Sequence, residues 1–227
     1  LFWGQSTKEH FANTANYLYL AGDLSGCYLA QPEYRSNTVE HKEREILIVK
    51  PENAIVVMDR GTSYDTARDK IFQIYLHNQA VQSGSQYRSS NGSGDLVIHR
   101  AYPAVSTVTL DTYGAPRLQI STSAAQLSKS FLTVLKVNAP GVAFVAPQAT
   151  SSVTDVAAAA FAGVSDPVDY LAAFSTDPQG DPSTASSFSL SFERSHSAVR
   201  AYLANLSPNT AYYIGGSTNG ATGVVTV

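Results

Sequence analysis

The chain has 227 residues, of which 44% are hydrophobic and only 15% are charged, and its formal net charge is -3. A chain of this size can bury a sizeable core and form one large domain or two small ones. The charged share is well below the roughly 25% usual in soluble domains, and no overall basic field is present to attract a polyanion. These values argue against a nucleic-acid binder, a coiled coil and a charge-driven disordered tail. An anionic ligand would need a local basic patch.

The apolar and alternating runs of the first part of the chain predict strands. In chain order, these are residues 17–21, 45–50, 54–58, 70–77, 95–101, 106–111, 118–122 and 131–137. The pair 45–50 and 54–58 flanks Pro51-Glu52-Asn53, which predicts a hairpin. Both runs are continuously apolar, which predicts strands that are covered on both faces. The Gly-rich, polar residues 83–94 predict a loop at the tip between two strands.

The composition changes near residues 139–141, and the later part of the chain is rich in Ala, Ser, Thr and Pro. Residues 188–193, 198–203 and 211–214 predict further strands. The Ala-rich residues 153–162 fit either a helix, on propensity alone, or a pair of strands. We therefore predict an all-β chain in two parts: an antiparallel β-sandwich in residues 1–148 and a smaller β-sheet region in residues 149–227.

Cys27 is the only cysteine, which excludes an intrachain disulfide and a zinc site built from cysteines. No run approaches the roughly 20 apolar residues that a membrane-spanning helix needs. The first residues lack the pattern of a signal peptide, and the chain begins without Met. We expect a mature protein or, in preference, a piece of a longer one. Secretion is compatible with the lack of disulfides.

Three polar residues near predicted strand ends are candidate metal ligands. His41 precedes the first hairpin strand, Asp59 ends the second, and His77 ends the following strand. Two imidazoles and one carboxylate are a reasonable ligand set for Zn²⁺. The alternative is that these are solvated residues at the rim of a sheet, with Asp59 in a local ion pair. His10 and His196 are expected to be ordinary surface or packed residues, with His99 kept as a reserve ligand or site contact.

The order of motifs between residues 17 and 77 resembles the β-sandwich of the heparinase II/III-like polysaccharide lyases. The motifs are Y-L-A-G-D-L-S-G-C-Y at 19–28, H-K-E-R-E-I-L-I-V-K-P-E-N-A-I-V-V-M-D-R at 41–60, and K-I-F-Q-I-Y-L-H at 70–77. The resemblance extends over about residues 15–140. It implies a structural zinc held by two His and one Asp, which His41, Asp59 and His77 match.

The resemblance also implies a function in the cleavage of uronate-containing glycans by β-elimination, in which Tyr and His commonly act as base and acid. In that family, most of this machinery lies on an N-terminal α/α toroid, which this chain lacks. We therefore expect the sandwich part of a secreted or periplasmic bacterial lyase, with an acidic polysaccharide and a toroid as partners. Alone, the chain is expected to be inactive. Tyr87, Arg88 and His99 are the candidate substrate contacts.

Two other functions stay open from the sequence. The many Tyr, Ser and Thr residues and the low charge suit a stand-alone carbohydrate-binding or cell-surface adhesion module equally well, because Tyr on an exposed β face is suited to sugar stacking. A structural β-protein without a ligand is the third possibility. Several hundred helical residues encoded directly upstream would favour the lyase, whereas a start codon and signal peptide would favour the binding module.

Overall fold

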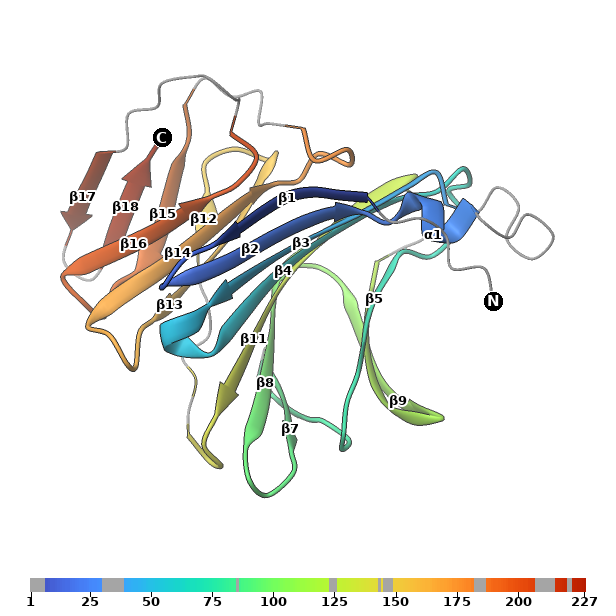
Figure 1. The fold of residues 1–227 in the computed structure, drawn as a ribbon, viewed down its shortest axis with the longest axis horizontal. Coiled ribbons are helices and arrows are strands. Elements are labelled where there is room, and N and C mark those ends of the chain that lie inside the picture. Colours follow the sequence, from blue (N-terminus) through green and yellow to red (C-terminus); the bar gives the residue numbers. More distant parts are fainter. Residues whose placement is uncertain are drawn as a thin grey trace. The chain divides into compact units, whose positions relative to one another are not determined.

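The computed structural model describes residues 7–29, 39–84, 86–122, 126–142, 144, 149–181, 187–206, 215–219 and 222–227. The chain divides into two compact units, Leu1–Phe144 (unit 1) and Val145–Val227 (unit 2). Most of the described residues lie in β-strands, which pair antiparallel with one exception (Figure 1). The predicted all-β, antiparallel fold class is therefore confirmed.

Unit 1 is a β-sandwich of two sheets. The large sheet contains, in spatial order, β1 (Thr7–Asn13), β2 (Tyr17–Asp23), β3 (His41–Val49), β4 (Ala54–Thr62), β11 (Ser128–Asn138), β8 (Asp95–Tyr102), β7 (Gln86–Ser90) and β6 (Val81–Ser83). The small sheet contains β5 (Ile71–Tyr75), β10 (Ala115–Ser121) and β9 (Thr107–Tyr113). Two short helical segments, α1 (Ser25–Leu29) and η1 (Lys50–Glu52), connect strands of the large sheet.

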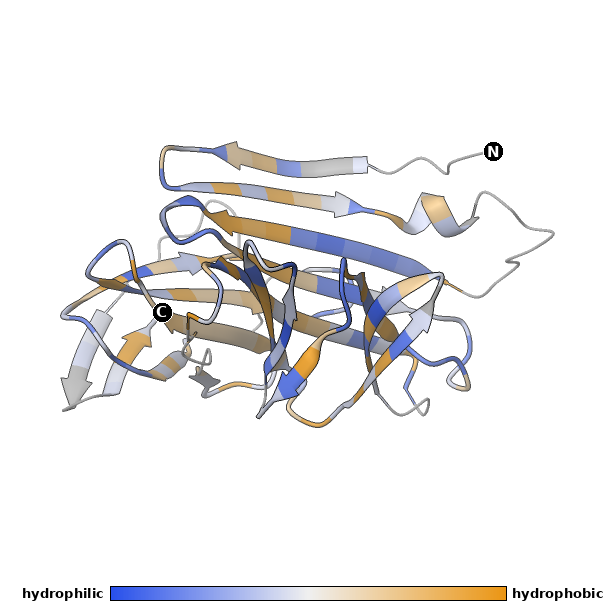
Figure 2. Ribbon diagram, turned by 90° about the horizontal axis from the view of Figure 1, so that it is seen from below, coloured by the Kyte–Doolittle hydropathy of each residue, from blue (hydrophilic) through white to orange (hydrophobic). Residues whose placement is uncertain are grey.

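The hairpin β3–β4 has the position expected from the sequence. Its turn is η1, and Asn53 closes it with a φ of 49°, a left-handed conformation that Asn tolerates better than most residues. Val56 and Val57 point to opposite faces of β4, and both are buried. The prediction that these strands are covered on both faces is confirmed for β4 only, because Ile46 and Ile48 on one face of β3 are half-buried. Figure 2 shows the apolar half of β3 next to the turn and its hydrophilic half at the start of the strand.

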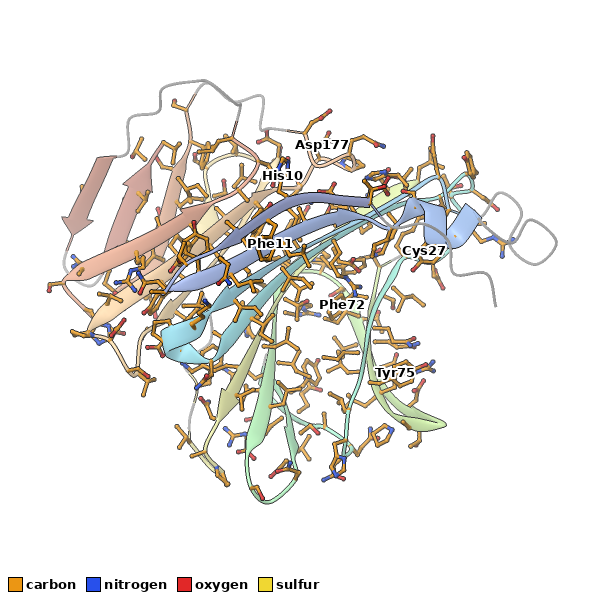
Figure 3. All side chains as sticks on the ribbon, in the orientation of Figure 1. His10, Phe11, Cys27, Phe72, Tyr75 and Asp177 are labelled. Carbon is orange, nitrogen blue, oxygen red and sulfur yellow. The ribbon has the colours of Figure 1, made fainter. Side chains whose placement is uncertain are left out.

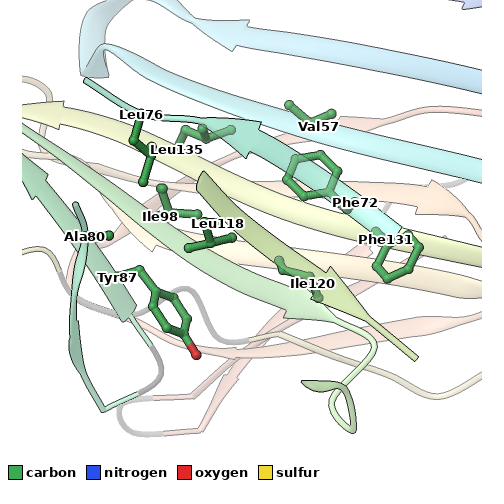
Figure 4. Packing of buried hydrophobic residues seen from close by; sticks show 10 residues of the cluster. All are labelled: Val57, Phe72, Leu76, Ala80, Tyr87, Ile98, Leu118, Ile120, Phe131 and Leu135. Atoms are coloured by element: carbon green, nitrogen blue, oxygen red, sulfur yellow. The ribbon is translucent and has the colours of Figure 1, made fainter. Parts of the chain in front are cut away.

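The core of unit 1 lies between its two sheets. Phe72 of β5 and Leu118 of β10 face Ile98 of β8 and Phe131 of β11 (Figure 4). The whole buried cluster is Val57, Phe72, Leu76, Ala80, Tyr87, Ile98, Leu118, Ile120, Phe131 and Leu135. We call the face of the large sheet that carries Val57 and Phe131 the inner face, and the opposite face the outer face.

One predicted loop is wrong in part. The stretch 83–94 was expected to be a polar tip, but its middle is the strand β7, which pairs with β8. The polar residues of β7 are typical of a loop, and only Tyr87 is a large apolar side chain. Tyr87 points to the inner face and lies in the core, while the remaining β7 residues are small or polar. β7 is held by backbone pairing with β6 and β8 and by the burial of Tyr87.

Unit 2 also has two sheets. One contains β12 (Thr150–Ser151), β15 (Ser189–Glu193), β18 (Thr222–Thr226) and β17 (Gly215–Asn219), and the other β13 (Val156–Ala162), β14 (Val168–Ser175) and β16 (Ala198–Leu203). The Ala-rich stretch is thus a strand, β13, whose small side chains are mostly buried. Among the strands that the structure describes, β14 and β16 are the one parallel pair. The predicted strand 211–214 lies outside the described residues.

Candidate functional site

Charged residues alternate along the first half of β3, where the sequence reads H-K-E-R-E. Successive side chains of a strand point to opposite faces. Arg44 pairs in register with Asp59, and Glu43 with Arg60. Asp59 shares the inner face with Val57. Arg44, its register partner, therefore lies on the inner face together with Lys42, and the two glutamates lie on the outer face.

On the inner face, one carboxylate binds two cations. The Lys42 Nζ lies 2.6 Å from Asp59 Oδ2, while Arg44 donates from Nε and Nη2 to the two Asp59 oxygens, at 3.1 Å each. Asp59 itself is only 1% exposed. The Arg44 guanidinium also lies over the Phe72 ring, 5.9 Å from its centroid. These contacts hold both cations in defined positions at the margin of the core.

A third cation lies on the same face. Lys42 and Lys129 are the register partners of Gly61 on its two sides, so all three residues share the inner face. A Cβ at Gly61 would lie 3.7 Å from Lys42 Cδ, which shows that the Lys42 side chain crosses over this glycine. Lys129 Nζ donates to Gln126 Oε1 at 2.6 Å. We call Lys42, Arg44 and Lys129, together with Asp59, the basic cluster; its formal charges leave an excess of positive charge.

Burial and the carboxylate of Asp59 shift the pKa values of Lys42 and Arg44 in opposite directions. Burial lowers the pKa of the Lys42 ammonium, although Asp59 opposes the shift. Burial acts in the same sense on Arg44, but the attraction of Asp59 outweighs it and raises the pKa of that guanidinium. A second anion beside these groups would therefore stabilise the charged form of Lys42, because one carboxylate compensates two partly buried cations only in part.

The outer face carries the opposite excess. Arg60 is fully buried and donates to Glu45 and, at 3.3 Å, to Glu43. The Tyr19 hydroxyl also donates to Glu45, and burial together with this carboxylate raises the pKa of Tyr19 above its usual value. We call these four residues the outer cluster. Buried groups of this kind are held by mutual pairing, and loss of one partner leaves an uncompensated charge.

The structure does not bring the three predicted zinc ligands together. His41 pairs in register with Thr62 and so lies on the outer face, opposite to Asp59; its Nδ1 is 3.4 Å from Ser25 Oγ. His77 is exposed after the end of β5. Asp59 is occupied by two cations, and no group of three or more His, Cys, Asp or Glu side chains that could hold a metal is found in the part of the chain that the structure describes. This arrangement does not fit one ion held by the three residues, and the zinc stays a prediction.

The three predicted substrate contacts are also separated. Tyr87 points into the core, whereas Arg88 and His99 lie on the outer face. Arg88 donates to Asp95 Oδ2 at 2.6 Å and to the Val142 carbonyl at 3.1 Å, and His99 is buried. These positions give no support to a joint contact of the three with a glycan.

Sequence reasoning missed the basic cluster, although a signal was present. The alternation of K and R with E and E at 42–45 predicts one basic and one acidic face once the segment is read as a strand. That segment was instead interpreted as an approach to the strand, with His41 as its notable residue. The position of Lys129 could not be found in this way, because it depends on the pairing of β11 with β4.

The comparisons with known proteins give a likeness of structure alone. No protein-family model matches the sequence, and no curated protein matches it. The heparan sulfate lyase HepC of Pedobacter heparinus matches with a TM-score of 0.51 and 10% sequence identity, over 77% of this chain and 28% of that one. A heparinase III gene product matches with a TM-score of 0.52 and 8% identity, over 75% of this chain and 28% of that one. The fold is shared.

The likeness confirms, at the level of fold, the resemblance seen in the sequence. A match over 77% of the chain is longer than unit 1 alone, so it includes part of unit 2. The chain spans only about 28% of the length of these lyases. Among the described residues, no helix has the length and apolar character needed to cross a membrane.

Proposed function

We propose that the chain is the β-sandwich module of a protein that binds and processes an acidic polysaccharide. The observation that carries this proposal is the likeness of fold to two lyases whose names specify heparan sulfate or heparin-type substrates. In this proposal, the module supports one side of the glycan and contributes stability. Secretion or a periplasmic location follows from the nature of such a substrate.

The basic cluster is the proposed contact with the polymer. It contains three cations and one carboxylate, and the Arg44 side chain is 36% exposed, so that an anion can reach it. Carboxylate and sulfate groups of a glycan are suited to the forked guanidinium of Arg44 and to the ammonium groups beside it. Since the net charge of the chain is negative, binding depends on this local excess and should weaken as salt is added.

The module has no elimination activity of its own in this proposal. β-Elimination requires a base that removes the proton next to the uronate carboxylate, together with groups that neutralise the developing charge. Asp59, the acidic residue of the basic cluster, is held by two cations and is nearly inaccessible, so it is a poor base. The catalytic groups are assigned to a further domain, which the sequence resemblance predicts to be an α/α toroid.

An apolar strip on unit 1 is the proposed contact surface for that domain. On the inner face of β1, β2 and β3, register brings together Phe11, Leu18, Leu20, Ile46 and Ile48. Phe11 is 55% exposed (Figure 3), and the others are half-buried. Exposed apolar area of this kind is typical of interaction sites, and the lyases of similar fold have most of their length outside the matched region.

Binding of the purified chain to heparan sulfate and to alginate, measured by isothermal titration calorimetry at low salt, tests the proposal. Arg44→Gln and Lys129→Gln should each weaken binding at least tenfold. Lys50→Gln is the matched control, because Lys50 is an exposed lysine at the opposite end of the same hairpin. Absence of binding to both polymers, or equal loss in the control, contradicts the proposal. Release of unsaturated uronate by the chain alone, followed by ultraviolet absorbance, contradicts the assignment of catalysis to another domain.

A further inference from the structure

The solvent-facing side of the small sheet carries an ordered polar surface. Phe72, Leu118 and Ile120 point into the core, so their neighbours along β5 and β10 point away from it. The register of the three strands places the outward residues in three rows across the sheet. These rows are Tyr75–Arg117–Asp111, Gln73–Gln119–Thr109 and Ile71–Ser121–Thr107.

The polar groups of this surface are held by one another. Arg117 donates from Nε and Nη2 to the two oxygens of Asp111, at 2.7 and 2.6 Å. Gln73 Oε1 accepts from Gln119 Nε2 at 2.8 Å and from Arg117 Nη1 at 3.4 Å. Donors and acceptors on three strands thus have fixed directions before any ligand arrives, which reduces the entropy lost on binding.

The charge of the surface is balanced. Arg117 and Asp111 form a bidentate pair, and the hydrogen bond from Arg117 holds the pKa of the Asp111 carboxyl below its usual value. The remaining outward residues of the three rows are neutral amides, hydroxyls, one tyrosine and one isoleucine. This balance distinguishes the surface from the basic cluster, because a polyanion gains no net attraction here.

Two apolar side chains lie along the β5 edge of the surface. Tyr75 is 56% exposed (Figure 3), and Ile71 is 42% exposed. They are four residues apart on one strand and on one face, which corresponds to about 13 Å. Tyr75 also neighbours Arg117 across the strands, and its hydroxyl interacts with that guanidinium. An aromatic ring beside oriented planar polar groups suits a ligand that has an apolar ring face and a rim of hydroxyls.

We infer that the outward side of β5, β10 and β9 binds a neutral polysaccharide, with Tyr75 stacking on a sugar ring. In this arrangement Gln73 and Gln119 exchange hydrogen bonds with the sugar hydroxyls, and Asp111 accepts hydrogen bonds from them. This site is separate from the basic cluster, and its ligand is uncharged. The inference does not depend on the proposed acidic substrate. It adds a second glycan contact of different chemistry to the same unit.

Titration of the full chain with three soluble neutral polysaccharides, a β-glucan, a mannan and a galactan, tests the inference. At least one should bind, and this binding should persist at high salt, because no ion pair with the ligand forms. Tyr75→Ala should lower the association constant at least tenfold, and Gln119→Ala severalfold. Tyr64→Ala is the control, because Tyr64 is 52% exposed but lies in the loop after β4. Unchanged far-UV circular dichroism shows that each variant is folded.

Three outcomes would overturn the inference: no binding of any of the three neutral polymers, unchanged binding by Tyr75→Ala, or equal losses in Tyr75→Ala and Tyr64→Ala. Binding of acidic polymers alone, sensitive to Arg44→Gln and not to Tyr75→Ala, would remove this site and leave the proposed function intact. Binding of a neutral polymer that Tyr75→Ala abolishes, without any binding of heparan sulfate or alginate, would support this site and contradict the proposed function.

Discussion

Replacement of Arg60 by methionine tests the energetics of the outer cluster. Arg60 and Glu45 are both fully buried, and Glu43 is nearly so. Methionine keeps much of the length and the apolar stem of arginine but removes the only guanidinium that pairs both carboxylates in this cluster. Two buried carboxylates would then lie on adjacent outer-face positions of one strand without their shared guanidinium, so the variant measures the cost of removing that cation from a buried cluster.

The expected loss of stability is large. Removal of one partner from a buried ion pair costs about 3–5 kcal/mol. For a protein of this size, each kcal/mol lowers the midpoint of thermal unfolding by roughly 2–4 °C. The midpoint of Arg60→Met should therefore fall by roughly 6–20 °C. Urea unfolding followed by circular dichroism measures the free energy, with the exposed Arg68→Met as the control.

The pH dependence gives an independent check. Burial and a neighbouring like charge disfavour the ionised form of a carboxyl that has lost its cation. A carboxyl whose folded pKa is raised destabilises the folded state when ionised, and this penalty disappears as the pH falls through the folded pKa. The deficit of the variant relative to the wild type should thus be smaller near pH 5 than near pH 7. A loss below about 1 kcal/mol at neutral pH, or a deficit that grows on acidification, would refute the reasoning.

The remaining predictions concern a glycine and the metal. Gly163→Ala should destabilise unit 2 by about 1–3 kcal/mol, because the new Cβ would lie 2.6 Å from the Val168 carbonyl oxygen; thermal unfolding should show no comparable effect for Gly216→Ala, where the nearest atom is at 3.6 Å. If zinc binds as the sequence resemblance predicts, elemental analysis will find it in the purified chain, and chelation will lower the thermal midpoint. Chain purified from zinc-supplemented cells without bound zinc would contradict the metal prediction.

The fold class could be predicted because period-2 patterns and turn residues are local signals. The β3–β4 hairpin is the clearest case: two apolar runs and a Pro-containing turn define both strands within a few residues. The Ala-rich β13 was ambiguous, since alanine favours helices and only pairing with β14 makes it a strand. β7 was missed because its polar residues resemble a loop and its one core side chain has no periodic partner.

The candidate sites could be predicted only in part, because facing and pairing are non-local. His41 and Asp59 both lie near the polar end of the β3–β4 hairpin, as expected, yet the parity of their positions in the register puts them on opposite faces of one sheet. A shift of one residue in register would have placed them on the same face. The surface around Tyr75 could not be predicted either, because Arg117 and Asp111 lie near Tyr75 only through the pairing of β10 with β5 and β9.

The two charged clusters of the β3–β4 hairpin are physically coupled, because successive residues of β3 belong alternately to one cluster and to the other. Lys42 and Arg44 on the inner face are separated by Glu43, whose carboxylate pairs with Arg60 on the outer face. Within the hairpin, Lys42 and Arg44 exceed Asp59 by one positive charge, and Glu43 and Glu45 exceed Arg60 by one negative charge. Lys129 of β11 adds a further positive charge to the inner face. A change that moves β3 to relieve one cluster therefore displaces the other. Glycan binding by outer-cluster variants should consequently fall with their stability, whereas Lys129→Gln, on β11, should weaken binding at unchanged stability.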